Sequence, residues 1–270
     1  MQKILLAMNA LDVKNSSIQF ASYIANLTKS KVTGVFLEHR VPQTILHASV
    51  NNEPPPYVEL VDIREHLVTK NIELFKNICI GKDARYSVHR CVGIPIDEII
   101  RESLFADLLI TDAGTSFLPG DQEGWPSKFV ASLLAEAKCP VILAPFYFDG
   151  LNEIIFAYDG TDSSIFAIKQ FTYLFPQLSE TKITLLQVLS EDETDITEKE
   201  KLKGWLMMHY NAVHLESVNG QPDVELFKVF LTRKNKLLVM GAYGRKMFFK
   251  RSTAELVLKT SDVPLFITHR

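Results

Sequence analysis

The sequence predicts an α/β fold made of two tandem, doubly wound parallel sheets of five strands each, of the Rossmann-like type. Three observations support this prediction. Short apolar runs alternate with segments of helical periodicity, the same pattern begins again after the middle of the chain, and 270 residues are enough for two domains of about 130 residues. A short linker from Phe146 to Asn152 separates the repeats, so we expect domains at residues 1–147 and 153–270.

The first repeat alternates strands and helices from its start. An apolar run from Lys3 to Met8 is typical of a strand buried on both faces of a parallel sheet, and apolar residues from Ile18 to Leu27 recur at the period of a helix. Residues 41–58 contain three successive prolines and indicate a loop. The other elements predicted for this repeat are strands at 32–37, 86–92, 107–111 and 140–144, and helices at 60–78, from Pro95 onward and at 128–138.

The pattern of the first repeat begins again at Ile154, and four further segments of the first repeat then recur in the same order. The matched segments are 16–18 with 163–165, 92–95 with 219–222, 108–110 with 237–239, and 139–142 with 263–266. Landmarks that return in one order indicate a tandem duplication. Each repeat is then an open parallel sheet covered by helices on both faces, and such sheets bind ligands at the carboxyl ends of their strands.

The segment after the fourth strand of the second repeat is the strongest candidate for a ligand site. Its two glycines, three residues apart, let bare backbone N–H groups approach an anion closely. A serine then opens the next helix, whose start adds unpaired N–H groups and the positive end of the helix dipole. Together these features form the parts of a phosphate-binding turn. The candidate residues are Met240, Gly241, Gly244, Arg245, Ser252 and Thr253.

Asp159 ends the first strand of the second repeat, and we expect it at the same edge of the sheet as the glycines. A purely structural interpretation stays open for each of these residues. The glycines fit a turn that ends a strand, and Asp159 before Gly160 fits a turn residue. Ser252 and Glu255 fit a capping box, whose hydrogen bonds would compete with a phosphate for the same N–H groups.

With these residues and landmarks, the chain resembles the universal stress protein family in its tandem form, over essentially its whole length. The family has an adenine nucleotide alpha hydrolase-like fold, and its nucleotide-binding members carry Gly-x2-Gly-x9-Gly-Ser/Thr after the fourth strand and an aspartate ending the first. Gly241, Gly244 and Ser252 fall on that motif, Asp159 falls on the aspartate, and Val188 lies near the position of the adenine contact. The resemblance implies that the second domain binds an adenine nucleotide, with ATP as the expected ligand.

The glycine loop departs from the family motif. Seven residues separate Gly244 from Ser252 where the family pattern has ten, and Arg251 stands in place of the third glycine. A bulky side chain there hinders close approach of a phosphate. Cations in the loop, including Arg245 and Lys246, would compensate through their charge.

The first repeat departs further from the motif. Asn9 takes the place of the aspartate, and Asp112 and Thr115 stand at the two leading glycine positions. A carboxylate at such a position would repel phosphate. We therefore expect residues 1–145 not to bind nucleotide and to serve as a structural or partner-binding half.

Composition limits the classes of partner. The net charge of −3 gives no basic field for nucleic acid, and no apolar stretch is long enough to span a membrane, so we expect neither as a partner. Cys79, Cys91 and Cys139 have no metal-ligand spacing and fit buried thiols in a reducing compartment, so we expect a cytoplasmic protein. The strands from Pro140 to Ala144 and from Pro264 to Thr268 are expected to pair, either within the chain or in a homodimer.

Three hypotheses about function follow from the sequence. The first is a non-catalytic regulatory protein of the stress response that binds an adenine nucleotide. The second is a nucleotide-free module for dimerisation and protein interaction, which the shortened loop favours. The third is a flavin or adenylate enzyme of similar architecture, and it is the weakest because the sequence has no Ser-His-Asp elbow, no Gly-Lys-Ser phosphate loop and no paired carboxylates.

Overall fold

The computed structural model describes residues 1–39, 57–118, 126–189, 198–221, 224–226, 228, 235–241 and 263–268, with backbone alone at 57–61. The first half contains β1 (Lys3–Asn9), α1 (Asn15–Leu27), β2 (Lys31–His39), α2 (Tyr57–Gly81), β3 (Tyr86–Gly93), α3 (Pro95–Ser103), β4 (Leu108–Asp112), α4 (Lys128–Glu136) and β5 (Val141–Ala144). The second half contains β6 (Glu153–Ala157), α5 (Asp162–Leu174), the 3-10 turn η2 (Pro176–Leu178), β7 (Lys182–Leu189), α6 (Glu198–Leu206), β8 (Val213–Asn219), β9 (Lys236–Gly241) and β10 (Leu265–Thr268).

The predicted alternation of strands and helices is confirmed over the described residues, with boundaries shifted by a few residues, and two of these shifts concern helices. Helix α2 begins at Tyr57, so the end of the segment predicted as a loop, residues 41–58, is helical. Helix α4 stops at Glu136 because Ala137 already has extended backbone, with φ −54° and ψ 145°. Pro140 follows closely, and a chain that approaches a proline leaves the helical region.

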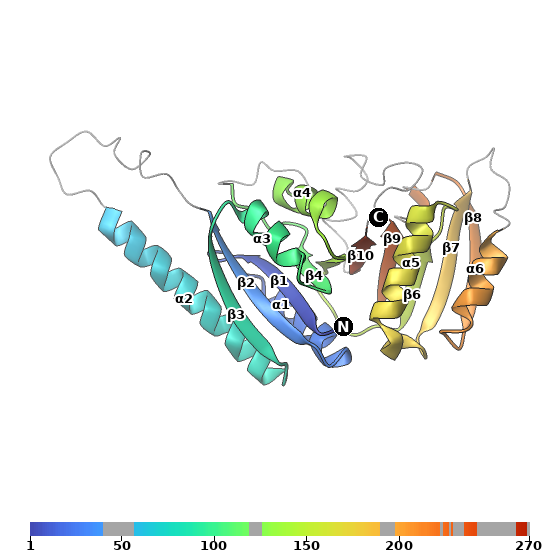
Figure 1. Ribbon diagram of the computed structural model, residues 1–270, viewed down its shortest axis with the longest axis horizontal. Helices are drawn as coiled ribbons and strands as arrows, with labels where there is room; N and C mark the ends of the chain where they lie inside the picture. The colour runs from blue at the N-terminus through green and yellow to red at the C-terminus, as the bar shows by residue number, and fades with distance from the viewer. Residues whose placement is uncertain are drawn as a thin grey trace.

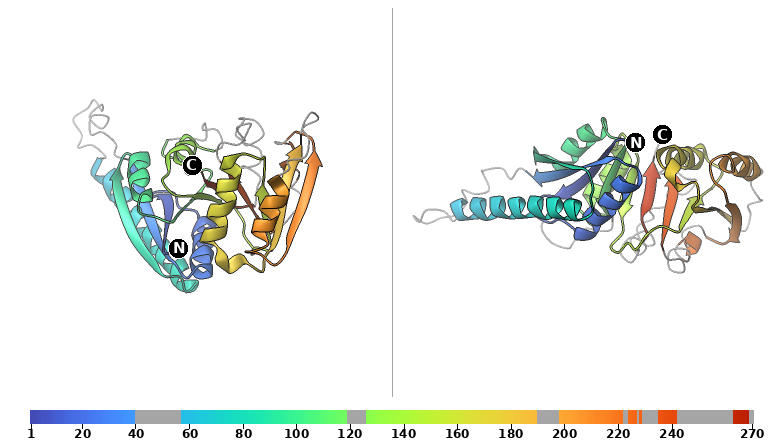
Figure 2. Two further views of the ribbon diagram at one scale, coloured as in Figure 1. Left: turned by 45° about the vertical axis from the view of Figure 1, so that its right-hand side comes forward. Right: turned by 90° about the horizontal axis from the view of Figure 1, so that it is seen from below.

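The two predicted five-stranded parallel sheets are present, and they join edge to edge into one sheet of ten strands. Its strand order is β3-β2-β1-β4-β5-β10-β9-β6-β7-β8. All neighbouring strands within each half run parallel, whereas β5 and β10 pair antiparallel at the junction. Figures 1 and 2 show these strands fanned into a twisted sheet with helices packed on its faces.

The junction has a symmetric register. Leu265 lies opposite Leu143, Phe266 opposite Ile142, and Ile267 opposite Val141. Within the two halves, Val141 and Leu265 hold corresponding places beside β4 and β9. The pair at the centre therefore marks a local two-fold axis, as in an isologous dimer contact, but inside one chain. Both strands have a neighbour on each side, so neither offers a free edge, and the terminal strands of the described sheet are β3 and β8.

The two halves share their apolar core. The cluster beneath α1, α2, α5 and α6 runs continuously across both halves. Phe148 of the linker packs on Phe20 at 5.0 Å and on Tyr23 at 4.8 Å between ring centroids, and Phe171 of α5 packs on Phe266 at 5.2 Å. A second cluster lies on the opposite face, beneath α3 and α4. Separation of the halves would expose to water the part of the continuous cluster that lies between them.

A turn at the start of α3 shows how closely the two repeats correspond. The matching residues are Gly93, Glu98 and Arg101 in the first half and Gly220, Glu225 and Lys228 in the second. In each half the glutamate pairs at 2.6 Å with the cation three residues later. Its carboxylate oxygen also lies 2.8 Å from where a Cβ on the glycine would be. Glycine therefore leaves room for a helix-start carboxylate in both repeats.

Two facing positions at the amino end of the central strands carry charged residues of opposite sign in the two repeats. In the first half the backbone N–H of Lys3 donates to the carboxylate of Asp107 at 2.9 Å. In the second half Glu153 lies opposite Lys236, which is 1% exposed. Glu153 also binds Lys182 of β7 at 3.1 Å. The same two strand positions thus carry opposite charges in the two repeats.

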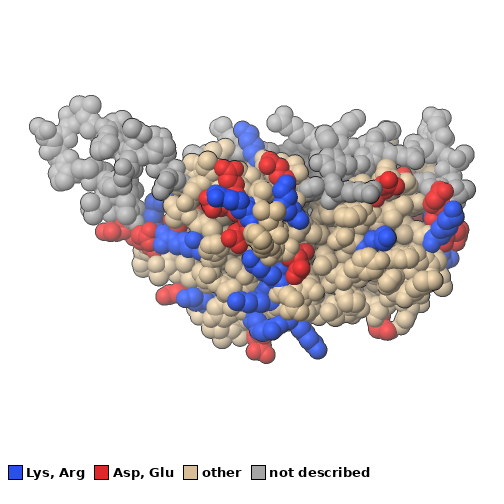
Figure 3. All heavy atoms as spheres, viewed as in Figure 1, with Lys and Arg blue, Asp and Glu red and all other residues tan. Residues whose placement is uncertain are grey.

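Surface charge also differs between the halves. Figure 3 shows acidic and basic side chains interspersed over the first half and few of them over α5 in the second, with charged side chains again at the end of the molecule where α6 lies. No helix in the described part of the chain has both the length and the hydropathy needed to cross a membrane.

Replacement of Asp107 by Asn tests the polar contact at the start of β1. Burial acts to raise the pKa of this carboxyl, but the N–H groups of Lys3 and Gln2 donate to it and the pKa is lowered overall. The carboxylate therefore stabilises the fold above the ordinary aspartate pKa, and this contribution is lost as pH falls through the lowered value. We expect Asp107→Asn to reduce the free energy of unfolding at pH 7 by about 1 kcal/mol, discounted for partial exposure.

Urea unfolding of both proteins at pH 7 and at pH 2.5 measures this effect. The difference between wild type and variant should shrink at the lower pH. An equal difference at both pH values would contradict the role given to the carboxylate.

Candidate functional site

The candidate site lies at the carboxyl ends of β6, β7 and β9, which we call the second-half edge. Strand β6 pairs with β7 on one side and with β9 on the other, so the strand order reverses between β6 and β9. Three of the predicted residues, Asp159, Val188 and Gly241, lie at the ends of these neighbouring strands. This is the position where open parallel sheets bind ligands. The predicted residues Gly244, Arg245, Ser252 and Thr253 lie outside the described residues.

Asp159 organises the start of α5. One carboxylate oxygen accepts from the backbone N–H of Thr161 at 3.0 Å and from its hydroxyl at 2.6 Å. Thr161 caps the helix, because its hydroxyl oxygen accepts from the backbone N–H of Ser164 at 3.2 Å. Gly160 between them has φ +77°, which suits glycine. Asp159 therefore has the turn role left open by the sequence, and it brings a carboxylate to the edge at the same time.

Gly241 is required by a close approach of α5 to the end of β9. A Cβ at this position would lie 2.6 Å from the backbone carbonyl carbon and oxygen of Ser163, and closer still to its hydroxyl oxygen. No side chain fits there without a shift of the α5 backbone. The close approach sets the first turn of α5, with its positive dipole end, directly beside the end of β9.

Val188 and Met240 contribute differently to the edge. Val188 is partly buried and packs against the apolar cluster on the face of α3 and α4. Met240 is 4% exposed and belongs to that same cluster. The side chain of Met240 is thus a core side chain, so a ligand at this edge would meet its backbone.

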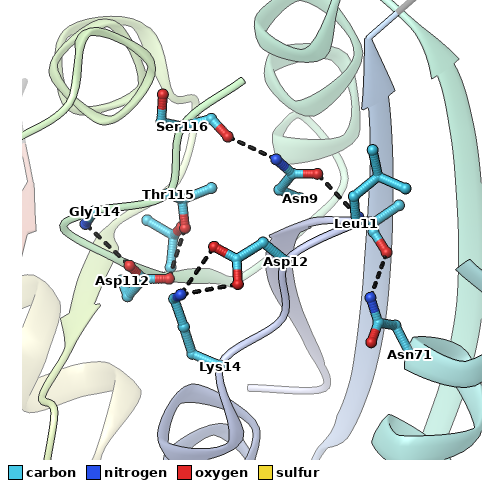
Figure 4. Close-up of polar contacts among 11 residues, drawn as sticks. Asn9, Leu11, Asp12, Lys14, Asn71, Asp112, Gly114, Thr115 and Ser116 are labelled. Carbon is cyan, nitrogen blue, oxygen red and sulfur yellow. Dashed lines mark hydrogen bonds and ion pairs between the residues drawn. The ribbon is translucent and has the colours of Figure 1, made fainter. Parts of the chain in front are cut away.

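The corresponding edge of the first half is filled by its own side chains (Figure 4). Asp112, at the place of Gly241, accepts from the N–H of Gly114 at 3.0 Å and from the hydroxyl of Thr115 at 2.7 Å. Asn9, at the place of Asp159, donates to the carbonyl of Ser116 at 2.7 Å and accepts from the N–H of Leu11 at 3.0 Å. The loop after β4 is thereby bound to the end of β1.

Further contacts hold that first-half loop and the neighbouring segment after β1 in place. The backbone N–H of Ser127, at the start of α4, donates to the carbonyl of Ala113 at 3.1 Å. Asn71 of α2 donates to the carbonyl of Ala10 at 2.8 Å, and Asp12 pairs with Lys14 at 2.8 Å beside the loop. The first-half edge thus carries buried carboxylate and threonine side chains where the second-half edge carries glycine.

Sequence reasoning missed two residues that shape the second-half edge. Thr161 was not singled out, although Asp-Gly-Thr before a helix is a turn-and-cap signal. Ser163 entered the sequence comparison as a repeat landmark alone, and its contact with Gly241 depends on tertiary packing. No local pattern could have revealed that contact.

No protein-family model and no curated protein matches the sequence. Solved structures match the fold. A universal stress protein from Archaeoglobus fulgidus superposes with a TM-score of 0.67 at 14% identity, over 99% of this chain and 98% of its own. A Pseudomonas aeruginosa protein provisionally assigned to the universal stress proteins gives a TM-score of 0.57 at 15% identity, over 100% of this chain and 93% of its own. The chain has the tandem universal stress protein fold.

Both matches extend over nearly the full length of each chain, so the universal stress protein fold accounts for both halves. The fold resemblance expected from the glycine motif and the repeat landmarks is confirmed. At this level of identity the likeness concerns architecture, and the chemistry of the edge must come from the residues of this chain.

The cysteines of this universal stress protein fold are poor nucleophiles. All three are buried and free. Burial raises the pKa of Cys139 to about 12, and burial together with the nearby carboxylates of Glu102 and Glu98 raises the pKa of Cys91 to about 11. Among the residues that the structure describes, no group of three or more His, Cys, Asp or Glu side chains is placed to hold a metal ion.

Substitution of Gly241 by Ala tests the packing of α5 on β9. Because the new methyl group would meet backbone atoms of Ser163, we expect a loss of about 2 kcal/mol in the free energy of unfolding. Gly204 provides a matched control, since it lies within α6 and has open space around it. Gly204→Ala should gain roughly 0.5–1 kcal/mol, as alanine favours the helix. Urea unfolding measures both variants, and a shift of both in the same direction would contradict the packing argument.

Thiol titration tests the raised cysteine pKa values. With a pKa of about 11, roughly a thousandth of Cys91 is thiolate at pH 8, so an aromatic disulfide reagent should react slowly with the native protein. In denaturant all three thiols should react within minutes. Rapid reaction of even one native thiol at pH 8 would show that its burial or its surroundings differ from the structure.

Proposed function

We propose that the chain is a cytoplasmic regulatory protein of the stress response that binds one adenine nucleotide, with ATP as the ligand, at the second-half edge and does not turn it over. The difference between the two corresponding edges carries this proposal. At the end of the fourth strand the first half has Asp112, held by its neighbours, while the second half has Gly241 and the start of α5. At the end of the fourth strand an anionic ligand would meet the Asp112 carboxylate in the first half, and in the second half bare backbone beside the start of α5, with the Asp159 carboxylate at the neighbouring strand end.

The residues at the second-half edge suit positioning of a ligand. Asp159 sets the cap of α5, and its place at the edge suits contact with adenine or ribose, while Val188 lies near the position that the family resemblance assigns to adenine. The glycine segment that follows β9 contains Arg245 and Lys246, whose charges favour phosphate. A nucleotide bound at this edge would change the surface that the second half presents, and a partner protein would recognise that surface. This supports a regulatory ligand rather than a substrate.

A second candidate function is a nucleotide-free interaction protein. Two observations favour it. Asp159 and Gly241 both have structural roles in the turn and packing of α5, so neither needs a ligand to explain it. The loop from Gly244 to Ser252 is also shorter than in the nucleotide-binding family motif.

Internal pairing, in place of a homodimer through the last strands, belongs to the same proposal. Strands β5 and β10 lie inside the ten-stranded sheet and bind each other, so a homodimer through them would need an exchange of halves between two chains. We therefore propose that one chain supplies the complete functional unit.

Calorimetric titration with ATP, ADP and AMP tests nucleotide binding. We expect one equivalent of ATP per chain, bound more tightly than AMP because the loop cations contact the added phosphates. Gly244→Val should weaken binding at least tenfold, since its side chain would block the backbone from the phosphate. Thr115→Val is the matched control, because Thr115 holds the corresponding position of the first half.

Circular dichroism and thermal unfolding establish that each variant is folded, and chromatography of the purified protein detects nucleotide that stays bound. The Thr115 variant should bind as wild type does. Binding of two equivalents of ATP per chain would contradict the proposal that the first half does not bind nucleotide. The absence of both heat and retained nucleotide would leave the interaction protein as the better account.

A further inference from the structure

The outer surface between α5 and α6 carries a cluster of aromatic, methionine and lysine side chains. We call it the α5–α6 patch, and it consists of Lys169, Tyr173, Lys201, Trp205, Met208 and His209. Tyr173 is 57% exposed and Met208 is 82% exposed, and neighbouring Met207 is 59% exposed. Aromatic and methionine side chains left in water at this density mark surfaces that bind other molecules.

The rings of the patch are packed against one another. The centroids of Trp205 and His209 are 4.5 Å apart, and each ring lies 5.9 Å from that of Tyr173 in an edge-to-face arrangement. The ammonium of Lys169 lies 5.9 Å from the centre of the Trp205 ring, a cation–π contact. These mutual contacts make the patch a preformed surface that would lose little conformational entropy on binding.

The fold does not require this aromatic surface, because the first half forms the corresponding contact, between α1 and the end of α2, with other residues. Helices α1 and α5 have equal length and corresponding positions, so Asn26 takes the place of Tyr173. Lys82 takes the place of His209. The side-chain amide of Asn26 donates to the carbonyl of Lys82 at 2.7 Å, so a hydrogen bond joins α1 to the end of α2. The aromatic residues of the second half are therefore additional to what packing demands.

The charges on the patch are cations without carboxylate partners. Neither Lys169 nor Lys201 forms an ion pair in the structure as described, and Lys201 lies one helical turn before Trp205. The acidic residues of α6, Glu198 and Glu200, stand in its first turn, at the opposite end of the helix from Met208. The exposed apolar area is thus flanked by positive charge, in a chain whose net charge is −3.

We propose that the α5–α6 patch docks an acidic amphipathic helix of a partner protein. The apolar face of such a helix would cover Tyr173 and Met208, where methionine adapts to the shape of the incoming side chains. Its carboxylates would pair with Lys169 and Lys201, which favours an acidic partner and speeds its association. The site is on the helix surface of the second half and is separate from the second-half edge.

Single-stranded nucleic acid is the other class of ligand that binds aromatic and lysine side chains. Such binding needs ring faces open for bases to stack on. In the patch the edge-to-face contacts among Tyr173, Trp205 and His209 use ring faces within the cluster, and the exposed methionines offer a base no stacking surface. The geometry therefore favours a helix with aliphatic anchors.

Fluorescence anisotropy with a labelled model peptide tests the proposal. The probe is an amphipathic 18-residue helix with leucine on one face and glutamate on the other. The full chain should bind it at micromolar concentration, and binding should weaken as salt is raised. Met208→Ser, and the double variant Lys169→Glu with Lys201→Glu, should each weaken binding at least tenfold.

Three controls make the test specific. Lys70→Glu changes an exposed lysine of α2 in the first half and should leave binding unchanged. A peptide with lysine in place of every glutamate should bind at least tenfold more weakly than the acidic peptide. Equal binding of the two peptides, failure of the acidic peptide to bind, or tighter binding of a labelled ten-residue oligouridylate would each overturn the proposal.

Discussion

Antiparallel pairing of β5 with β10 is the contact on which the rest of the structure depends. It turns two parallel five-stranded sheets into one ten-stranded sheet, and it covers the outer edge that each half would otherwise expose. Its symmetric register places Phe266 opposite Ile142 at a local two-fold axis. The apolar cluster beneath α1, α2, α5 and α6 includes residues of both halves, so the core is continuous across this pairing. A single chain thereby contains the edge-to-edge strand pairing that a homodimer would otherwise form between two subunits.

Internal pairing also explains why the two halves differ so much in their details. Because both halves lie in one polypeptide, each can change its residues independently, whereas the subunits of a homodimer must change together. The first half fills its edge with Asp112 and Asn9, while the second keeps Gly241. The contact between α1 and the end of α2 in the first half is polar, whereas the contact between α5 and the end of α6 in the second half is aromatic. The two halves thus share one fold and differ in the side chains at both of these places.

The sequence predicted the architecture more fully than it predicted the site. Apolar runs such as Lys3 to Met8 and the returning landmarks follow from local periodicity, so the strands, helices and duplication could be identified. The need for glycine at 241 has a tertiary cause, the approach of Ser163, which local spacing cannot reveal. Asp107 and Lys236 hold corresponding positions with opposite charges, and this correspondence likewise depends on which strands become neighbours. The glycine motif predicted a ligand site at the second-half edge, and the packing of α5 on β9 explains why Gly241 is glycine.

Hydrogen exchange of the β5 and β10 amides in the native protein is the most direct test of the central claim, that the junction is an interior part of one cooperative sheet. We predict protection comparable to that of β1 and β6 and independent of protein concentration, because the pairing is within one chain. Exchange of β5 and β10 as fast as that of the terminal strands β3 and β8, while β1 and β6 stay protected, would contradict the account.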